Sequence, residues 1–478
     1  MTLHQLTSSR FKQQAAKALE DEVLQDNLVK LKGNFLQRRA NARESLPEFD
    51  DLRDIAVGIK THTLEHLDLY LEAFENAVEA SGGHVHWARD DAEARNLVLA
   101  ICRAENAKTV TKGKTMVGEE IGLNAYLEAN GITPVETDLG EYIIQLAGEP
   151  PSHIIAPAIH KNRQQVAELF NDHHPDLADR GPDDVDGLLA DARAVLRQRF
   201  LKADVGITGA NFLIAETGQT VIVTNEGNGD LTQLLPRVHL VVAGIEKVVP
   251  SLEDATSIMR ILARSGTGQE MSSYTSFSAG TRRPGDIDGP EAFHVVLVDN
   301  GRSALLGSPT EEILRCIRCG CCLNACPVYG KVGGHAYGST YSGPVGAVLT
   351  PALAGLAETN HLPNASSLCG RCEAVCPMRI PIPKMLRHLR EEEARSGRAP
   401  AAARNGLSLW AAFAKRPGLY RWATNLAMCV LAGRAGKRGR FASLPGAGAW
   451  TRDRDLAAPQ GTSFQTRWKK GERPGTWA

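Results

Sequence analysis

The sequence predicts an α/β domain between a helical N-terminal arm and a smaller helical domain rich in cysteine, followed by an irregular C-terminal tail. The chain has 478 residues, more than one hydrophobic core usually organises. Short apolar runs alternate with helical patterns through its middle, which is typical of a parallel sheet. Eight of the ten cysteines lie between Cys316 and Cys376, which marks a separate domain. The predicted domains are 1–83, 84–300, 301–394 and 395–478.

The arm and the first βαβ unit follow from residue spacing. Apolar residues three and four apart predict helix before a stop at Gly82-Gly83. These residues are Leu64, Leu67, Leu71, Phe74 and Val78. After the stop, His84–Ala88 is predicted as a strand, Asp90–Glu105 as a helix that begins with acidic residues, and Lys108–Thr111 as a second strand.

The alternation continues to about residue 300. Further strands are expected at Ile132–Glu136, Ile154–Ala156, His239–Ala243 and Phe293–Val298, and helices at His160–Phe170 and Val185–Lys202. Phe212–Glu216 and Thr220–Thr224 flank Thr217-Gly218 and predict a β-hairpin. Ser265–Gly289 is rich in Gly, Ser, Thr and Arg without periodicity, and is expected to be a long functional loop or a passive connector.

The last third of the chain contains the cysteine-rich domain and the tail. A helix is expected at Val345–Ala357, between two cysteine motifs. Five of the six tryptophans follow Arg395, in segments rich in Ala, Gly and Arg. Such a composition is typical of disorder, but buried tryptophans dominate interface energetics. We therefore expect a tail that docks on its own chain or on a partner.

Charge and hydropathy exclude several classes of protein. The net charge of -1 argues against a nucleic-acid binder, which usually carries a strong basic excess. The N-terminus has no apolar segment, so no signal peptide and a cytoplasmic location are expected. Apolar runs such as Val238–Val242 and Ala427–Ala432 are far shorter than the roughly 20 residues that cross a bilayer, so no transmembrane segment is expected. The clustering of the cysteines favours metal binding over disulfides.

The first cysteine motif has the spacing of bacterial two-cluster ferredoxins. Its pattern C-x2-C-x2-C-x3-C-P is formed by Cys316, Cys319, Cys322, Cys326 and Pro327. In that arrangement three thiolates bind one iron–sulfur cluster, while the fourth binds the other cluster. The second motif repeats the pattern with Cys369, Cys372 and Cys376, but Ser366 stands at its first position.

The ferredoxin arrangement predicts two sets of ligands. The first ligand set is Cys316, Cys319, Cys322 and Cys376; the second ligand set is Cys326, Cys369 and Cys372. The second set is one cysteine short. Its cluster is either a three-iron centre, or its fourth iron is bound by Ser366, by solvent or by a more distant group. Cys321 adjoins Cys322 and is expected to point away from the clusters as a spare thiol.

Zinc is the main alternative, because paired C-x2-C motifs also form tetrahedral zinc sites. Seven cysteines divide poorly into groups of four, however, and the two Cys-Pro endings are features of iron–sulfur proteins. Cys102, in a predicted helix, and Cys429, in an apolar run, are expected to be buried small hydrophobic residues.

A candidate pocket follows the strand that ends near Thr111. Parallel sheets commonly bind ligands at the carboxyl ends of their strands. The polar residues expected there are Lys112, Lys114, Glu119 and Glu120, joined by Glu226 after the hairpin. An ordinary solvated, charged turn is the competing interpretation.

Nucleotide-binding motifs and histidine sites are not supported. Gly113-Lys114-Thr115 lacks the glycine that a phosphate-binding loop needs five residues before Gly113, where Lys108 stands. No G-x-G-x-x-G follows a strand. Histidines next to apolar runs are expected to be core residues rather than ligands; these are His153, His160, His239 and His294.

The whole chain resembles the lactate utilization protein B family, the iron–sulfur subunits of bacterial L-lactate oxidation complexes. The resemblance rests on both cysteine motifs and on Phe35–Arg39, Lys112–Glu120, Glu216–Gln219, Thr224–Asn228, Trp450 and Ser463–Trp468. It implies a lactate-utilization domain similar in fold to ring-closing folate ligases and CoA transferases, followed by a ferredoxin-like helical domain. It also implies two four-iron clusters held by the seven cysteines of the two ligand sets.

The resemblance implies an electron-transfer subunit of an L-lactate dehydrogenase complex rather than a stand-alone enzyme. The implied partners are a cysteine-rich subunit of the heterodisulfide-reductase type and a small subunit with a lactate-utilization domain. Two alternatives stay open. The α/β domain could itself act on a carboxylate or CoA-type substrate, or the substrate could be another 2-hydroxy acid such as glycolate.

Overall fold

The computed structural model describes residues 6–444, 448–451 and 454–472. The chain forms two compact units, Met1–Arg395 and Ser396–Ala478, and each is described by itself. The first unit is mixed α/β with a parallel sheet and many helices, as predicted.

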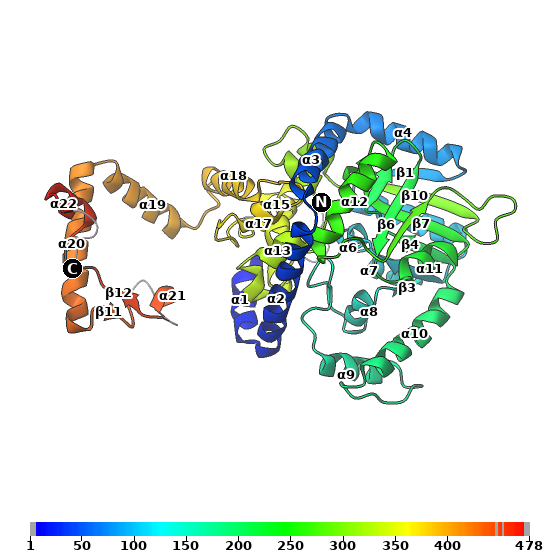
Figure 1. The fold of residues 1–478 in the computed structure, drawn as a ribbon, viewed down its shortest axis with the longest axis horizontal. Helices are drawn as coiled ribbons and strands as arrows, with labels where there is room; N and C mark the ends of the chain where they lie inside the picture. The colour runs from blue at the N-terminus through cyan, green and yellow to red at the C-terminus, as the bar shows by residue number, and fades with distance from the viewer. Residues whose placement is uncertain (1–5, 445–447, 452–453, 473–478) are drawn as a thin grey trace. The chain divides into compact units, whose positions relative to one another are not determined.

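Six parallel strands form the central sheet of the first unit, in the order β1-β10-β7-β4-β2-β3 (Figure 1). The strands are β1 His84–Ala88, β2 Thr109–Gly113, β3 Thr133–Glu136, β4 Val205–Thr208, β7 Val238–Gly244 and β10 Ala292–Val298. In the register of these strands, Val295 of β10 is paired with Val85 of β1 and with Val241 of β7. Its strands are apolar runs because both faces of the sheet are covered.

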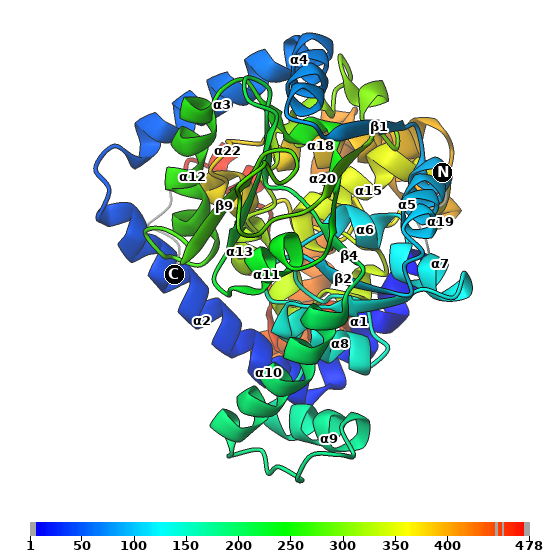
Figure 2. The same ribbon diagram turned by 90° about the vertical axis from the view of Figure 1, so that its right-hand side faces the viewer.

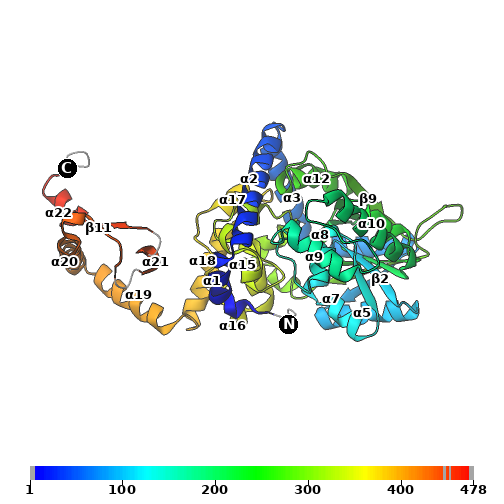
Figure 3. The same cartoon turned by 90° about the horizontal axis from the view of Figure 1, so that it is seen from below.

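Helices α5 (Asp91–Ala104) and α7 (Leu123–Ala129) cover one face of the sheet, as Figure 3 shows from below. Helix α4 (Leu67–Ala80) covers the other face together with a small second sheet. That sheet has the order β8-β5-β6-β9 and consists of β5 Phe212–Ile214, β6 Gln219–Thr224, β8 Val248–Val249 and β9 Tyr274–Ser278. The predicted hairpin is confirmed, since β5 and β6 pair antiparallel.

The remaining helices of this part frame the sheets. They are α1 Phe11–Glu20, α2 Glu22–Glu44, α3 Phe49–Glu65, α6 Met116–Glu120, α8 Leu139–Leu146, α9 Arg163–His173, α10 Val185–Lys202, α11 Asn228–Leu234 and α12 Leu252–Gly266. The long helix α2 runs along one side of the unit (Figure 2) and packs against both α12 and the cysteine-rich part. The N-terminal helices therefore join the two parts.

The connections of the sheet change direction between β2 and β4. The chain leaves β2 for β3 on one side and leaves β4 for β7 on the other side, while β2 and β4 are neighbours. Such a switch point opens a crevice at the carboxyl ends of the strands, where α/β proteins bind ligands. At Gly209, just after β4, a Cβ atom would lie 2.4 Å from the carbonyl oxygen of Lys114, so only glycine permits this close approach.

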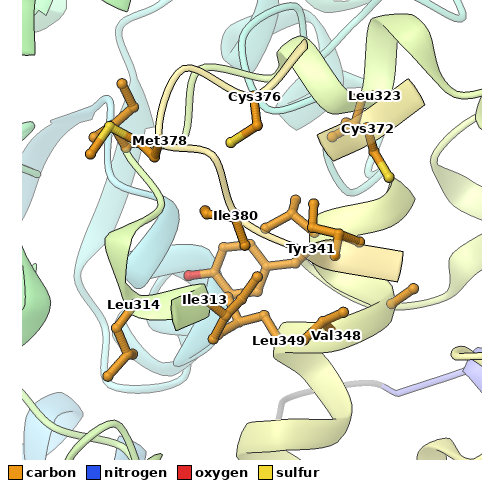
Figure 4. Packing of buried hydrophobic residues seen from close by; sticks show 14 of the residues in the cluster. Ile313, Leu314, Leu323, Tyr341, Val348, Leu349, Cys372, Cys376, Met378 and Ile380 are labelled. Atoms are coloured by element: carbon orange, nitrogen blue, oxygen red, sulfur yellow. The ribbon is translucent and has the colours of Figure 1, made fainter. Parts of the chain in front are cut away.

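The cysteine-rich part is a bundle of short helices. They are α13 Cys321–Ala325, α14 Tyr329–Val332, α15 Gly343–Ala354, α16 Leu356–Thr359, α17 Arg371–Val375 and α18 Ile382–Arg395. Figure 4 shows its apolar packing, in which Leu349, Met378 and Ile380 lie close to Tyr341 and Cys376. These residues surround the cysteine loops with side chains that exclude water.

The sequence predicts an irregular tail, but the structure shows helices there. The second unit consists mainly of helices α19 (Ala401–Ala414), α20 (Pro417–Ala435) and α22 (Phe464–Lys469). It also has the short elements β11 Arg440–Phe441, α21 Gly448–Thr451 and β12 Leu456–Ala457. Alanine-rich segments without inner proline favour helix. Docking of the tail stays a prediction, and Trp477 lies outside the described residues.

Three local predictions were wrong. Ile154–Ala156 is a turn rather than a strand, because the amides of Ile155 and Ala156 donate to Nδ1 of His153 instead of to a neighbouring strand. The expected loop Ser265–Gly289 contains the end of α12 and strand β9, which pairs with β6. Helix α9 begins three residues later than expected because Asn162 and Gln165 form a capping box there.

The buried His239 on β7 makes stability depend on pH. Its Nε2 lies 2.8 Å from Oγ1 of Thr208, and burial lowers its pKa to about 3. The folded state keeps this imidazole neutral, while the unfolded state takes up a proton below about pH 6.5. We expect the free energy of unfolding to fall by about 2 kcal/mol between pH 6.5 and pH 5 through this group. Urea unfolding should show a flatter pH profile for His239→Gln; an unchanged slope would contradict this assignment.

Candidate iron–sulfur centre and adjoining cavity

The two cysteine loops have the same backbone conformation. Arg318 and Leu368 stand one residue before the second cysteine position of each motif, and both have positive φ angles, of 58° and 54°. Gly320 and Gly370 follow those cysteines with φ angles of 70° and 80°, and each precedes a short helix. Left-handed residues turn each loop so that its side chains converge. Helices α13 and α17 then pack against each other.

The first ligand set surrounds a small cavity. Cys316, Cys319, Cys322 and Cys376 line a cavity of about 20 Å³, the cluster cavity, together with Ile317, Met378 and Ile380. Burial and then the neighbouring thiols of Cys316, Cys319 and Cys376 raise the pKa of Cys322 well above its ordinary value. Cysteines of both motifs thus line one cavity, Cys321 among them.

The second ligand set forms a separate group nearer the surface. Burial and then the thiols of Cys326 and Cys369 raise the pKa of Cys372 to about 12. Cys369 is exposed, whereas Cys326 and Cys372 are buried. The amide of Tyr329 donates to Sγ of Cys326 over 3.4 Å. This group therefore combines cysteines of both motifs, and one side of it faces solvent.

These residues fit iron–sulfur clusters. All ten cysteines are free thiols rather than disulfides. Burial also raises the pKa of Cys376 to about 12, so that a metal ion is needed to hold this sulfur as thiolate at neutral pH. The amide of Arg318 donates to Sγ of Cys316 over 3.4 Å, a contact that stabilises charge on a ligand sulfur. The assignment of individual ligands stays a prediction.

Cys321 also lines the cluster cavity, but its thiol has a backbone partner. Its thiol donates to the carbonyl oxygen of Val375 over 3.3 Å, on the side of α13 that faces α17. We expect Cys321→Ala to leave the iron content unchanged, because the thiol of Cys321 is hydrogen-bonded to the carbonyl oxygen of Val375. Iron analysis of the purified variant checks this; a loss of iron would make Cys321 a ligand.

The other two cysteines differ from each other. Cys102 is fully buried in α5, as predicted. Cys429 is exposed on α20, contrary to the prediction, and its thiol donates to the carbonyl oxygen of Gly461 over 2.7 Å. The apolar run around it forms a helix with only one buried residue, Ala435.

A buried chain of ion pairs connects the α/β domain to the first cysteine loop. Arg302 is fully buried and donates to Glu120 through both terminal nitrogens, at 2.9 and 2.7 Å. Its Nε lies 2.7 Å from Glu246, whose other oxygen lies 3.2 Å from Arg318. The guanidinium of Arg318 lies 4.9 Å from the ring of Tyr341. The loop that carries Cys319 is thereby fixed to the sheet.

A larger cavity of about 610 Å³, the sheet-edge cavity, opens at the switch point of the central sheet. Its walls come from the loops that follow β2, β3, β4 and β7, and they include Lys114, Asp138, Gly209 and Lys247. Cys319 and Arg318 line both this cavity and the cluster cavity. One loop of the first ligand set therefore separates the two.

Acidic groups gather around Lys114 in the sheet-edge cavity. Lys114 has a positive φ of 57° and its ammonium pairs with Asp138. Burial and then the carboxylates of Glu136 and Asp138 raise the pKa of Glu141 to about 8. Burial and Asp138 also raise the pKa of Glu226. A carboxyl group with the pKa of Glu141 can hold or release a proton near neutral pH.

The structure brings together only part of the predicted pocket. Lys114 and Glu226 line the sheet-edge cavity. Glu119 lies apart from it, paired with Lys112 at 2.7 Å beside a second cavity of about 590 Å³. Glu120 is fully buried and accepts from Arg302. The alternative of a solvated turn is wrong for Lys112 and Glu120, because both are buried.

Several important residues were missed from the sequence. Arg302, Glu246 and Lys247 were not singled out, and Arg318 was treated only as a spacer within the motif. Glu246-Lys247 follows a buried strand directly, so the rule that ligands bind at the carboxyl ends of strands points to it. Arg302 gives no comparable signal, since its partners are distant in sequence.

The fold and the grouped cysteines define an α/β domain joined to a cysteine-rich domain whose residues fit iron–sulfur clusters. A family model described as "LUD domain" matches residues 71–298, and one described as "4Fe-4S dicluster domain" matches residues 312–380. Among curated proteins, lactate utilization protein B of Bacillus licheniformis is 40% identical over 473 residues, covering 97% of this chain and 98% of the relative. The protein of that name from Geobacillus thermodenitrificans is 42% identical, covering 96% of each chain.

The chain belongs to the lactate utilization protein B family. The relative from Bacillus subtilis, 40% identical over 95% of each chain, agrees with this. A crystal structure of a DUF162 family protein from Deinococcus radiodurans covers 48% of this chain and 98% of its own, at 13% identity and a TM-score of 0.28. No helix among the described residues is both long and apolar enough to cross a membrane.

Proposed function

We propose that this protein is an iron–sulfur electron carrier in the oxidation of L-lactate to pyruvate. The observation that carries the proposal is the convergence of seven cysteines from two motifs into two groups beside an α/β domain. Iron–sulfur clusters bound there would supply one-electron transfer. The names of the relatives, lactate utilization protein B, support the substrate.

The proposed ligands follow the crossed arrangement. Cys316, Cys319, Cys322 and Cys376 hold the first cluster, and Cys326, Cys369 and Cys372 hold the second, both with four irons. A two-electron oxidation needs sites that accept electrons singly, and two adjacent clusters meet this need. Exposure of Cys369 supports exchange of electrons with another protein at the second cluster.

The protein acts in this proposal as one subunit of an L-lactate dehydrogenase complex. The partners we propose are a cysteine-rich subunit of the heterodisulfide-reductase type and a small subunit with a lactate-utilization domain. The solvent-facing second ligand set offers a place where such a partner could approach the clusters. A cytoplasmic location stays a prediction.

A second candidate function gives the α/β domain its own chemistry on a carboxylate or CoA-type substrate. Its supporting observation is the sheet-edge cavity, with Lys114 and Glu226 in its wall. The predicted likeness to CoA-transferase and folate-ligase folds belongs to this alternative. A third possibility retains the electron carrier but replaces L-lactate by glycolate.

The test is complementation of a strain that lacks the gene. We expect wild-type protein to restore oxidation of L-lactate, and Cys322→Ala to fail although the chain is still made. Glycolate oxidation is measured in the same cells. Restored L-lactate oxidation by the cluster-free variant would favour the enzyme alternative. If the strain without the gene loses oxidation of glycolate but not of L-lactate, the substrate is glycolate.

A further inference from the structure

The sheet-edge cavity has an unsatisfied positive wall. Lys247, which follows β7, is only 9% exposed. In the described part of the chain its ammonium makes no hydrogen bond or ion pair, and the groups of opposite charge that act on it are Glu246 and Cys316. The neighbouring carboxylate of Glu246 is already shared by Arg302 and Arg318. Nη1 of Arg318 is likewise buried without an acceptor in the described structure. Buried cationic donors are costly unless an anion pairs with them.

The cavity is roomy, and it has an apolar wall besides the acidic groups around Lys114. Its apolar wall consists of Met116, Val117, Leu139, Ile143, Ile155, Ile159, Val223 and Leu262. A volume of about 610 Å³ is in the range of sites that hold cofactor-sized molecules, and is large for a three-carbon acid alone. Its place at the switch point between β2 and β4 is the usual ligand site of such sheets.

We propose that the sheet-edge cavity binds an organic anion of cofactor size, with its acidic group against Lys247 and Arg318 and an apolar body along the strand ends. This binding goes beyond the electron-carrier role, because it requires no electron transfer. The acidic group is a carboxylate or a phosphate, both of which pair with lysine and arginine. A ligand held there would lie against the loop that carries Cys319.

The test uses two dyes that differ by one sulfonate group, and therefore in charge. The anion 8-anilinonaphthalene-1-sulfonate and its neutral analogue N-phenyl-1-naphthylamine are titrated into the full-length, cluster-containing protein without oxygen. We expect Lys247→Met to weaken the binding of the anionic dye at least about tenfold, as loss of a charged hydrogen bond does. The affinity for the neutral dye should not change. Lys247→Arg should retain binding. Lys202→Met, at an exposed lysine on α10, is the matched control.

Competition then separates the two sources of the acidic group. Displacement of the dye by flavin mononucleotide or phosphate supports a phosphate ligand, and displacement by naphthalene-1-carboxylate supports a carboxylate. The proposal is overturned if the anionic dye does not saturate, if Lys247→Met leaves its affinity unchanged, or if none of these anions displaces it.

A second inference concerns Ser366, and rests on the comparison of the two cysteine loops. In the first loop the amide of Arg318 donates to Sγ of Cys316, two residues before it, over 3.4 Å. In the second loop the amide of Leu368 donates to Oγ of Ser366, again two residues before it, over 3.1 Å. Since the following glycines also match in conformation, the serine oxygen occupies the place of the cysteine sulfur.

Hydrogen bonds from an arginine hold the backbone at Ser366. Arg390, on α18, donates to the carbonyl oxygens of Ser366 and Pro363 over 2.8 and 2.9 Å. Arg390 therefore fixes the backbone of the loop at Ser366, while the hydroxyl oxygen accepts from the amide of Leu368.

We infer that Oγ of Ser366 is the fourth ligand of the second cluster, beside Cys326, Cys369 and Cys372. This inference rests on the proposed ligand sets. The hydroxyl would release its proton to the adjoining solvent when the oxygen binds iron. An oxygen ligand at one corner makes that iron different from the other three.

Iron analysis with paramagnetic and Mössbauer spectra tests this role independently of activity. Wild-type protein should contain about eight irons per chain, and Ser366→Ala about seven with the signal of a three-iron centre. Ser366→Cys should restore the full iron content with altered spectra. An unchanged cluster in Ser366→Ala, or a three-iron centre already in the wild type, would overturn the inference. Failure of L-lactate to reduce intact clusters would instead overturn the proposed function.

Discussion

Cys372→Ala is expected to remove about half of the iron, that of the second cluster, and to leave the spectrum of the first cluster largely intact. The reason is that Cys372 groups with Cys326 and Cys369, while the thiols of the first ligand set meet around the separate cluster cavity. The measurement is iron content together with the low-temperature paramagnetic spectrum of the reduced protein. Electron transfer from L-lactate to an external acceptor should fall at least tenfold, because one carrier of the pair is lost.

A second variant in the same motif tests whether the two ligand sets are crossed. Cys376 lies only four residues further along the same motif, but it lines the cluster cavity with Cys316, Cys319 and Cys322. Cys376→Ala is therefore expected to remove the first cluster and to spare the second. If each motif held its own cluster, both variants would lose the same one. Cys102→Ala, also at a buried cysteine, controls for the loss of a thiol from a core.

Arg302→Met is expected to lower the free energy of unfolding by about 3–5 kcal/mol, the usual cost of breaking a buried ion pair from one side. The substitution leaves Glu120 buried without its cation, although Tyr341 still donates to it over 2.6 Å, and leaves Glu246 with Arg318 as its remaining arginine partner. Urea unfolding of the cluster-containing protein gives the difference.

A surface arginine with similar partners is the control for this prediction. Arg237 also pairs with two glutamates, Glu105 and Glu291, at 3.1 and 3.4 Å, but its side chain is 60% exposed. We expect Arg237→Met to change stability by less than about 1 kcal/mol. Equal effects of the two substitutions would show that the buried chain of ion pairs does not hold the domains together.

The βαβ unit, the hairpin and the grouping of the cysteines could be predicted because they depend on residues close together in sequence. The βαβ unit at residues 84–113 follows from the alternation of apolar runs and from the cap at Asp90, whose side chain accepts from the amide of Glu93. The hairpin followed from Thr217-Gly218. The cysteine spacing predicted two groups of thiols, because a loop of fixed length can bring its sulfur atoms to one point only.

Tertiary pairing decided the parts that the sequence did not predict. Strand β9 forms within a segment without periodicity because it pairs with β6, about fifty residues earlier. The buried pair of Glu120 and Arg302 joins residues 182 positions apart, so no local pattern reveals it. For the same reason Glu120 was assigned to a pocket, while Lys247, which does line the cavity, was overlooked.

The central claim is that L-lactate reduces clusters bound to this chain. The most direct measurement is made on protein purified without oxygen from its own host, with the partners that accompany it. L-lactate is added while the iron–sulfur absorption and paramagnetic signals are recorded. The account predicts bleaching of the absorption with L-lactate, and none with D-lactate or glycolate. Intact clusters that no 2-hydroxy acid reduces would contradict it.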